Sequence, residues 1–114
     1  MEIKVRIKEL KEEVAEVILE GEIDVYTSPK VKETLNSLIA EGQRFLVINL
    51  EEVTYIDSTG LGVLIGALKR IREKNGNIKL ICTNLQIKKI FEITGLVKIF
   101  AIYGNEQEAL ESLT

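Results

Sequence analysis

The sequence predicts an α/β protein with a mixed, mostly parallel sheet of about five strands and about four helices. Short apolar runs typical of strands alternate along the chain with segments whose apolar residues recur at helical spacing. The chain has 114 residues, 46% of them hydrophobic, which suffices for one core and is too short for two ordinary domains. It contains no internal repeat, linker or low-complexity tract, so we expect a single domain over residues 1–114.

The first third of the chain predicts a hairpin followed by a helix. Met1 to Glu9 alternates apolar and charged residues, as a half-buried strand does, and Val14 to Ile23 is a second strand. The short link between them favours antiparallel pairing. A helix then begins at Ser28-Pro29, with Ser28 as the N-cap and proline in the first turn, and it ends at Gly42.

The centre of the chain predicts a buried strand and a strongly apolar helix. The strand covers Phe45 to Leu50, and a short link through Val53, Tyr55 and Ile56 follows it. The helix runs from Leu61 to about Lys74, and Asn75-Gly76 ends it. Basic residues in its last turns suit the negative end of the helix dipole.

The last third continues the alternation with shorter elements. We expect a strand from Asn77 to Cys82, a helix capped by Thr83-Asn84 and ended by Gly95, a strand from Val97 to Tyr103, and a short helix capped by Asn105. The predicted order is therefore β-β-α-β-α-β-α-β-α.

This order predicts where a ligand or partner binds. The carboxyl ends of parallel strands open onto one edge of the sheet, where ligands usually bind. Three segments are expected at this edge, with the second in the middle: Asp24-Val25-Tyr26, Asp57-Ser58-Thr59 and Thr83-Asn84.

The composition excludes several classes of function. A net charge of −3 argues against nucleic-acid binding, which favours a basic stripe. The absence of histidine removes Ser-His-Asp and Cys-His catalysis and the commonest transition-metal ligand. The single cysteine, Cys82, excludes an intrachain disulfide and fits an inert core residue; with no N-terminal signal segment, it indicates the cytoplasm. No apolar run approaches the roughly 18 residues of a membrane span, and no pattern calls for a cofactor or metal.

The run Asp57-Ser58-Thr59-Gly60-Leu61-Gly62 is the most informative motif. It sets a hydroxyl at a helix N-terminus, which suits a phosphate or a docking partner, although serine is also a preferred N-cap. Gly60 and Gly62 each cost about 1 kcal/mol of helix propensity relative to alanine. Because glycine is costly here, we interpret Gly60 and Gly62 as residues that let a partner approach the helix closely. The alternative is that Gly62 and Gly66 let the helix pack closely against the sheet.

With these residues, the whole chain resembles a STAS domain of the anti-sigma factor antagonist family. The matching residues are Gly21-Glu22-Ile23-Asp24, Asn49-Leu50, the run from Tyr55 through Gly62, Cys82-Thr83-Asn84 and Ile93-Thr94-Gly95-Leu96. The strand-end aspartate together with the Asp-Ser-Thr-Gly-Leu-Gly run is a specific combination, whereas either part alone is weak.

The resemblance implies a regulatory switch. In this family the unphosphorylated antagonist binds an anti-sigma factor that is also a serine kinase, which frees the sigma factor. The kinase phosphorylates the serine that matches Ser58, and a metal-dependent serine/threonine phosphatase resets the switch. The residues expected at the partner-binding surface are Asp24, Asp57, Ser58, Thr59, Gly60, Leu61 and Gly62.

Several of these residues have a structural alternative. Asp57 is equally suited to accept backbone N–H bonds in the strand-to-helix turn. For Asp24 we favour partner binding over an Asx-turn before the first helix, and expect its substitution to leave thermal stability nearly unchanged. Thr59 is an alternative phosphoacceptor, and Leu61 fits the core stripe of its helix better than a docking position.

Two other functions compete with the antagonist. STAS-like domains also occur as non-enzymatic subunits of signalling assemblies or of lipid-transport ATPases, but an intact motif in a free-standing chain favours the antagonist. An enzyme using Ser58 would need a lysine or carboxylate as base, and the sequence has neither a Gly-x-Ser-x-Gly elbow nor a phosphate-binding loop. We therefore expect no enzymatic activity.

Overall fold

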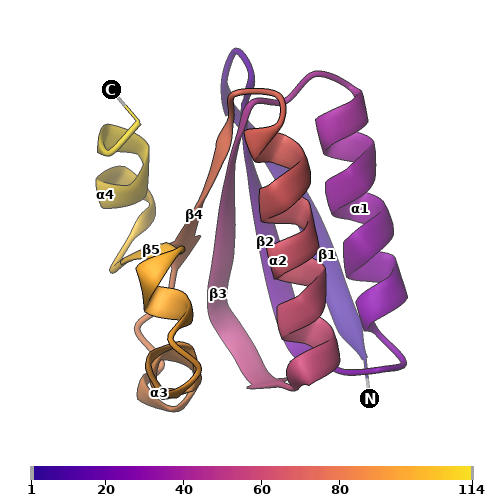
Figure 1. The fold of residues 1–114 in the computed structure, drawn as a ribbon, viewed down its shortest axis with the longest axis vertical. Helices are drawn as coiled ribbons and strands as arrows, with labels where there is room; N and C mark the ends of the chain where they lie inside the picture. The colour runs from indigo at the N-terminus through magenta and orange to yellow at the C-terminus, as the bar shows by residue number, and fades with distance from the viewer. Residues whose placement is uncertain (1, 114) are drawn as a thin grey trace.

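The five strands of the sheet lie side by side in the order in which they occur in the chain. A computed structural model describes residues 2–113 and gives the order β1-β2-β3-β4-β5 (Figure 1). The strands are β1 (Ile3–Lys11), β2 (Val14–Ile23), β3 (Phe45–Ile56), β4 (Asn77–Ile81) and β5 (Ala101–Tyr103). β1 pairs with β2 antiparallel, and the other pairings are parallel. The predicted hairpin and the predicted mixed, mostly parallel sheet are confirmed.

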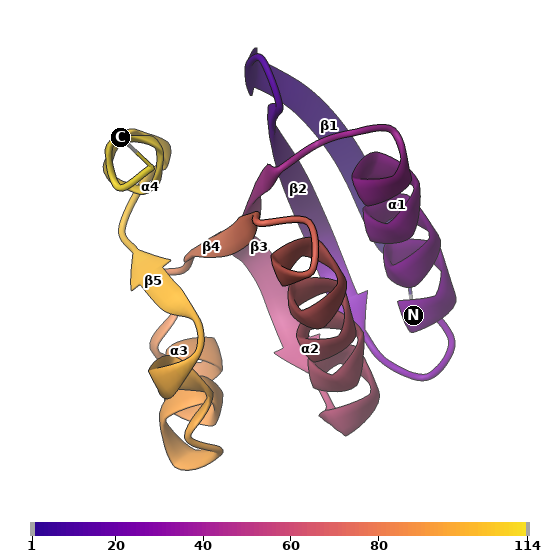
Figure 2. The same cartoon turned by 45° about the horizontal axis from the view of Figure 1, so that its top comes forward.

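Helices cover both faces of this sheet. They are α1 (Ser28–Ala40), α2 (Ser58–Arg72), α3 (Leu85–Ile93) and α4 (Glu106–Glu111), with a 3₁₀ turn η1 (Leu96–Lys98) after α3. Right-handed crossovers put the connecting helices of neighbouring parallel strands on one face. There α1 and α2 lie side by side, whereas α4 lies on the opposite face (Figure 2). No helix within residues 2–113 is long and apolar enough to cross a membrane.

The main core lies between the sheet and the helices α1, α2 and α3. Leu19 and Ile48 from the sheet and Leu64 from α2 are among its fully buried side chains. The rings of Phe91 and Phe100 meet edge to face with centroids 6.0 Å apart, which joins α3 to this core. Burial of each such side chain contributes about 1.5–3 kcal/mol. A smaller cluster under α4 contains Val47, Ile81 and Ala109.

A buried carboxyl group lies on the α4 side of the sheet. Glu16 of β2 is 1% exposed, and its Oε2 accepts a hydrogen bond from Asn49 Nδ2 at 2.9 Å. Its Oε1 is buried without a hydrogen-bond partner among residues 2–113. Burial, and then the neighbouring Glu106 of α4, raises the pKa of Glu16. The neighbouring carboxyl group of Glu16, and then Lys8, whose Nζ donates to Glu106 Oε2 at 3.1 Å, lower the pKa of Glu106.

The central strand is longer than predicted. The link expected through Val53, Tyr55 and Ile56 belongs to β3, because pairing with β2 continues to its end, with Gly21 opposite Val53 and Ile23 opposite Ile56. Gly21 itself has φ +123°, and a Cβ there would collide with the carbonyl group of Glu2. This glycine therefore lets the start of β1 lie close against the end of β2.

The predictions for the last strands were partly wrong. β4 ends at Ile81 rather than Cys82, and only Ala101–Tyr103 of the expected strand 97–103 pairs with β4. Gly95 adopts a left-handed conformation with φ 78°, after which residues 96–98 form a 3₁₀ turn. The turn returns the chain toward β4, and the buried Phe100 anchors it before β5 begins.

Candidate functional site

β2 and β3 end side by side, and an aspartate follows each of them. Ile23 is opposite Ile56 in the parallel register, and the Asp57 N–H donates to the Ile23 carbonyl oxygen at 3.2 Å. The segments that begin at Asp24 and Asp57 are therefore neighbours at the carboxyl edge of the sheet, as the predicted topology requires.

The third expected segment, Thr83-Asn84, does not extend as far toward the carboxyl edge of the sheet as the other two. β4 ends opposite Asn49, whereas β3 continues to Ile56. Thr83 donates from both its N–H and its hydroxyl to Glu51 Oε2, at 2.7 Å each. Asn84 caps α3 by accepting from the Gln86 N–H at 2.9 Å, as predicted. The expectation that three segments share this edge thus holds at the strand ends for two of them. The third contacts β3 at residues 51–53, before the end of that strand, because β4 is short.

Asp57 is the N-cap of α2. Its backbone is extended, and its Oδ1 accepts a hydrogen bond from the Gly60 N–H at 3.0 Å. The structural alternative for Asp57 is confirmed, and the N-cap alternative for Ser58 is wrong. Because Asp57 is the cap, α2 begins at Ser58 instead of at Leu61 as predicted. Such a cap contributes about 1 kcal/mol to stability.

The two hydroxyl residues after this cap face solvent. Ser58 and Thr59 occupy the first helical positions and are exposed. Their hydroxyl groups make no hydrogen bond with any atom of residues 2–113. Neither hydroxyl is needed to start the helix, so both are free to react or to contact another molecule.

Asp24 has a different environment from Asp57. It is 4% exposed, and its Oδ1 accepts from the Tyr26 N–H at 2.9 Å and from the Thr27 N–H at 3.0 Å. Burial raises the pKa of this carboxyl group, but the hydrogen bonds from Thr27 and Tyr26 outweigh it, so the pKa lies below its ordinary value. Its Oδ2 is buried without a hydrogen-bond partner within residues 2–113. The Asx-turn alternative for Asp24 is confirmed as its structural role.

The hydroxyl that organises the start of α1 belongs to Thr27. Thr27 Oγ1 accepts from the Asp24 N–H at 2.9 Å and donates to the Glu22 carbonyl oxygen at 2.7 Å. Thr27 occupies the N-cap position, and no side chain caps the helix. Ser28 is the buried first residue of α1, so its predicted role as N-cap is wrong.

The glycines of the motif have separate roles. A Cβ at the buried Gly60 would lie 2.6 Å from Ile23 Cγ2 and 2.8 Å from Ile56 Cγ1, so glycine is required where α2 rests on the strand ends. A Cβ at Gly62 would meet no atom within 4 Å, and one at Gly66 would meet the guanidinium of Arg70. The alternative that Gly62 and Gly66 pack against the sheet is therefore wrong. Gly60 has that role.

Leu61 belongs to the core, whereas Val25 and Tyr26 are exposed apolar residues at the strand-end edge. Leu61 is 8% exposed and contacts the main core, which confirms the alternative favoured by its spacing. Val25 and Tyr26, which follow Asp24, are 58% and 83% exposed. Both were expected at this edge as part of the segment Asp24-Val25-Tyr26, but not among the residues of the partner-binding surface. The sequence contained a signal for their role at the surface, because both are apolar residues that follow the end of β2.

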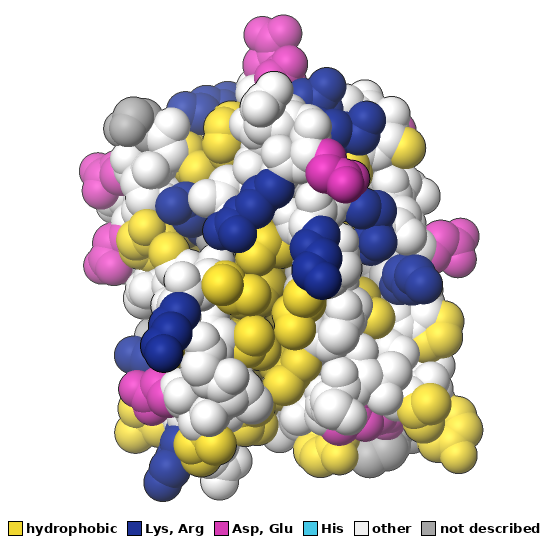
Figure 3. Space-filling model, viewed as in Figure 1, with side chains coloured by type: hydrophobic (Ala, Val, Ile, Leu, Met, Phe, Trp, Pro, Cys, Tyr) yellow, Lys and Arg dark blue, Asp and Glu magenta, His cyan; other side chains and the backbone are white. Residues whose placement is uncertain are grey.

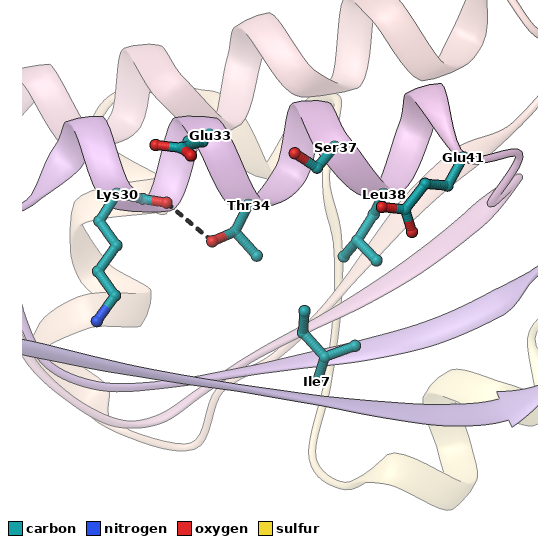
Figure 4. A pocket seen from close by; sticks show the side chains of 7 residues that line it. All are labelled: Ile7, Lys30, Glu33, Thr34, Ser37, Leu38 and Glu41. Carbon is teal, nitrogen blue, oxygen red and sulfur yellow. Dashed lines mark hydrogen bonds between the residues drawn. The ribbon is translucent and has the colours of Figure 1, made fainter.

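A hollow between β1 and α1 is a poorer candidate for a binding site (Figure 4). Its volume is about 320 Å³, and Ile7 and Leu38 form its apolar part. Thr34 donates its hydroxyl to the Lys30 carbonyl oxygen at 2.9 Å, so this polar group is already used. The charged ends of Lys30 and Glu33 point in different directions (Figure 4). No set of polar groups converges there to orient a ligand.

The fold and the strand-end edge define a small α/β binding module with free hydroxyls at a helix start. Residues 3–109 match the STAS domain, and the chain belongs to this family. It is 42% identical over 108 residues to the anti-sigma-B factor antagonist of Listeria monocytogenes, which covers 95% of each chain. Antagonists of this kind are regulatory binding proteins rather than enzymes, so the prediction of a non-enzymatic protein is confirmed.

Solved structures agree with this assignment. An anti-sigma factor antagonist from Mycobacterium paratuberculosis has a TM-score of 0.89 and 25% identity, covering 97% of this chain and 93% of that chain. The Bacillus cell fate determinant SpoIIAA in its phosphorylated form has a TM-score of 0.77 and 20% identity, covering 97% of this chain and 100% of that chain. The second likeness shows the fold alone.

Proposed function

We propose that this protein is an anti-sigma factor antagonist that phosphorylation of Ser58 switches off. In its unphosphorylated state it binds an anti-sigma factor with serine kinase activity, and a serine/threonine phosphatase restores it. The observation that carries the proposal is the exposed Ser58 hydroxyl, which makes no hydrogen bond within residues 2–113 and lies one residue after the cap of α2. The Listeria relative is named as an anti-sigma-B factor antagonist, and the Bacillus protein of this fold has a phosphorylated form. Such a protein acts in the cytoplasm, where sigma factors work.

The proposed switch does not require refolding. A phosphate adds roughly −1.5 to −2 charges at neutral pH, and a helix N-terminus tolerates negative charge. Asp57, and not Ser58, caps α2, so modification of Ser58 leaves the cap bond to Gly60 in place. A partner surface fitted to a neutral hydroxyl would meet a dianion near the carboxylates of Asp24 and Asp57. A loss of about 2–3 kcal/mol across the interface corresponds to roughly 30- to 150-fold weaker binding.

The proposed contact surface consists of the exposed residues around Ser58. Thr59 and Gly62 from α2 belong to it, and Gly62 has open space above it for close approach. Val25 and Tyr26 add apolar and aromatic area, which is enriched in protein interfaces. Gly60 and Leu61 lie in the core and support this surface from beneath.

Binding to a defined probe tests the proposal. The probe is the purified anti-sigma-B factor of Listeria monocytogenes, the protein that the 42% identical relative antagonises by name. Titration calorimetry compares wild type, Ser58→Ala and Ser58→Asp. A matched control, Ser37→Asp, places the same charge at an exposed serine of α1. We expect wild type, Ser58→Ala and Ser37→Asp to bind alike and Ser58→Asp to bind at least about 10-fold more weakly.

The phosphorylation itself is tested with the same probe and Mg-ATP. Mass spectrometry of proteolytic fragments is expected to find one phosphate on Ser58 in wild type and none in Ser58→Ala. Phosphate transfer to Thr59 instead would contradict the assignment of Ser58. Absence of both binding and phosphorylation would contradict the proposed function.

A further inference from the structure

A second hollow adjoins the proposed contact surface, between α1 and α2. Its volume is about 210 Å³, and it is lined by Lys32 from α1 and by Thr59, Gly62, Val63, Gly66 and Arg70 from α2. Thr59 and Gly62 also belong to the proposed contact surface, so the two features are continuous. Figure 3 shows this face of the molecule, where Lys and Arg side chains gather over α1 and α2.

The two cations of this hollow make no ion pair with any of residues 2–113. Within residues 2–113 the ion pairs are those of Lys4 with Glu20 and of Lys8 with Glu106. Lys32 and Arg70 make neither an ion pair nor a hydrogen bond with these residues, and Arg70 Nε is shielded from solvent without a partner. Two unpaired cations on neighbouring helices create a local positive potential in a protein whose net charge is −3.

Two glycines keep the hollow open. Gly62 has no atom within 4 Å of the position of a Cβ, and Gly66 lies beside Arg70, whose Nη1 would be 3.4 Å from a Cβ there. Glycine is disfavoured inside a helix, and neither residue is needed for packing against the sheet. Their effect is to leave the backbone of α2 accessible between the two cations.

We propose that this hollow receives a carboxylate side chain of the anti-sigma factor, bound by Arg70 and Lys32. The inference rests on the proposed function and adds a recognition element to it. A guanidinium binds a carboxylate with two parallel hydrogen bonds, and Lys32 adds a second positive charge from α1. The exposed Thr59 hydroxyl can donate a hydrogen bond at the mouth of the hollow. The attraction also leads the partner toward Ser58, because oppositely charged surfaces speed association.

Binding to the Listeria anti-sigma-B factor tests this inference. The test variant is the double mutant Lys32→Gln/Arg70→Gln. The control is Lys69→Gln/Arg6→Gln, which removes the same charges from exposed residues outside the hollow. We expect the test variant to bind about 10-fold more weakly, with a smaller dependence of Kd on salt concentration, and the control to keep both properties of wild type.

A second variant tests the hollow without removing a charge. Gly62→Gln fills the open space over α2 at an exposed position and is expected to weaken binding by a similar factor. Thermal unfolding followed by circular dichroism establishes that each variant is folded. Wild-type affinity and salt dependence in both Lys32→Gln/Arg70→Gln and Gly62→Gln would overturn the inference, while binding by wild type and Ser58→Ala would leave the proposed function intact. If wild type does not bind, the proposed function and this inference fail together.

Discussion

The starts of α1 and α2 use similar residues in opposite ways. Both helices follow a strand-end aspartate, and both have a threonine and a serine near their first turn. At α1 all three residues are buried, and the Thr27 hydroxyl is hydrogen-bonded to Asp24 and Glu22. At α2 the aspartate alone caps the helix, and Ser58 and Thr59 are exposed. Burial, and not residue type, therefore distinguishes a hydroxyl that builds the fold from one that is accessible to another molecule.

The largest expected effect comes from exchanging the two threonines for valine. Thr27→Val leaves the Asp24 N–H and the Glu22 carbonyl group without their partner, and should lower the free energy of unfolding by roughly 2–4 kcal/mol. Thr59→Val removes an exposed hydroxyl and should change it by less than about 0.5 kcal/mol. Urea unfolding measures both. Equal losses in the two variants would remove the distinction between the two helix starts.

A smaller contrast is expected for the glycines of α2. Gly60→Ala forces a methyl group against Ile23 and Ile56 and should cost about 1–3 kcal/mol. Gly62→Ala faces open space and should stabilise the protein by about 0.4–1 kcal/mol through higher helix propensity. The same unfolding measurement applies, and a stabilising Gly60→Ala would show that α2 is free to move away from the strand ends.

Loss of the α2 cap should have a moderate effect on stability. Asp57→Ala removes the acceptor of the Gly60 N–H and should cost about 1 kcal/mol, whereas Asp57→Asn keeps an oxygen acceptor and should cost less. Ser58→Ala should cost nearly nothing, since Ser58 is not the cap. A Ser58→Ala variant as unstable as Asp57→Ala, measured by thermal unfolding, would return the capping role to Ser58.

The smallest expected effect is a difference in pH dependence between two buried carboxyl groups of the β2 region. The pKa of Asp24 is lowered, so its contribution to stability is present above its ordinary pKa and is lost as pH falls through the lowered value. The pKa of Glu16 is raised, so its contribution is present below its ordinary pKa and is lost as pH rises through the raised value. Lys8, Glu106 and Asn49 are the charged and polar groups around Glu16.

Substitution separates these two contributions. Glu16→Gln should remain hydrogen-bonded to Asn49, remove the decline in stability above the ordinary pKa of glutamate, and raise stability at neutral pH. Asp24→Asn should instead remove the decline at acid pH. Chemical unfolding over a series of pH values measures both slopes, and a Glu16→Gln variant with the wild-type slope would contradict the assignment.

Several parts of the fold could be predicted from the sequence because their signals are local. The limits of β2, the end of α3 before Gly95 and the Asn84 cap depend on alternation, backbone freedom and side-chain reach. The start of β3 at Phe45 was predicted, but its end was missed, because the polar residues Glu51 and Glu52 interrupt the apolar run and the strand continues only through its pairing with β2. The N-cap alternative for α2 named Ser58, one residue after the actual cap Asp57, since aspartate and serine are equally good caps.

The candidate site was predicted in position but not in its internal contacts. Topology places Asp24 and Asp57 at neighbouring strand ends, which the element order already implies. The burial of Asp24 depends on how Thr27 folds back over it, and this contact reverses the expectation that substitution of Asp24 leaves stability nearly unchanged. The hollow of Lys32 and Arg70 depends on the packing of α1 against α2, which no local pattern in the sequence reveals.

The strands have the same order in the sheet as in the chain, and this affects how the protein folds during its synthesis. Each strand pairs with the strand that directly precedes it in the chain, so its neighbour has already left the ribosome when it appears. The β1–β2 hairpin forms the first template, and β3, β4 and β5 are added to one growing edge. The sheet can therefore begin to assemble while synthesis continues, with β3 pairing to β2 before β4 and β5 are added.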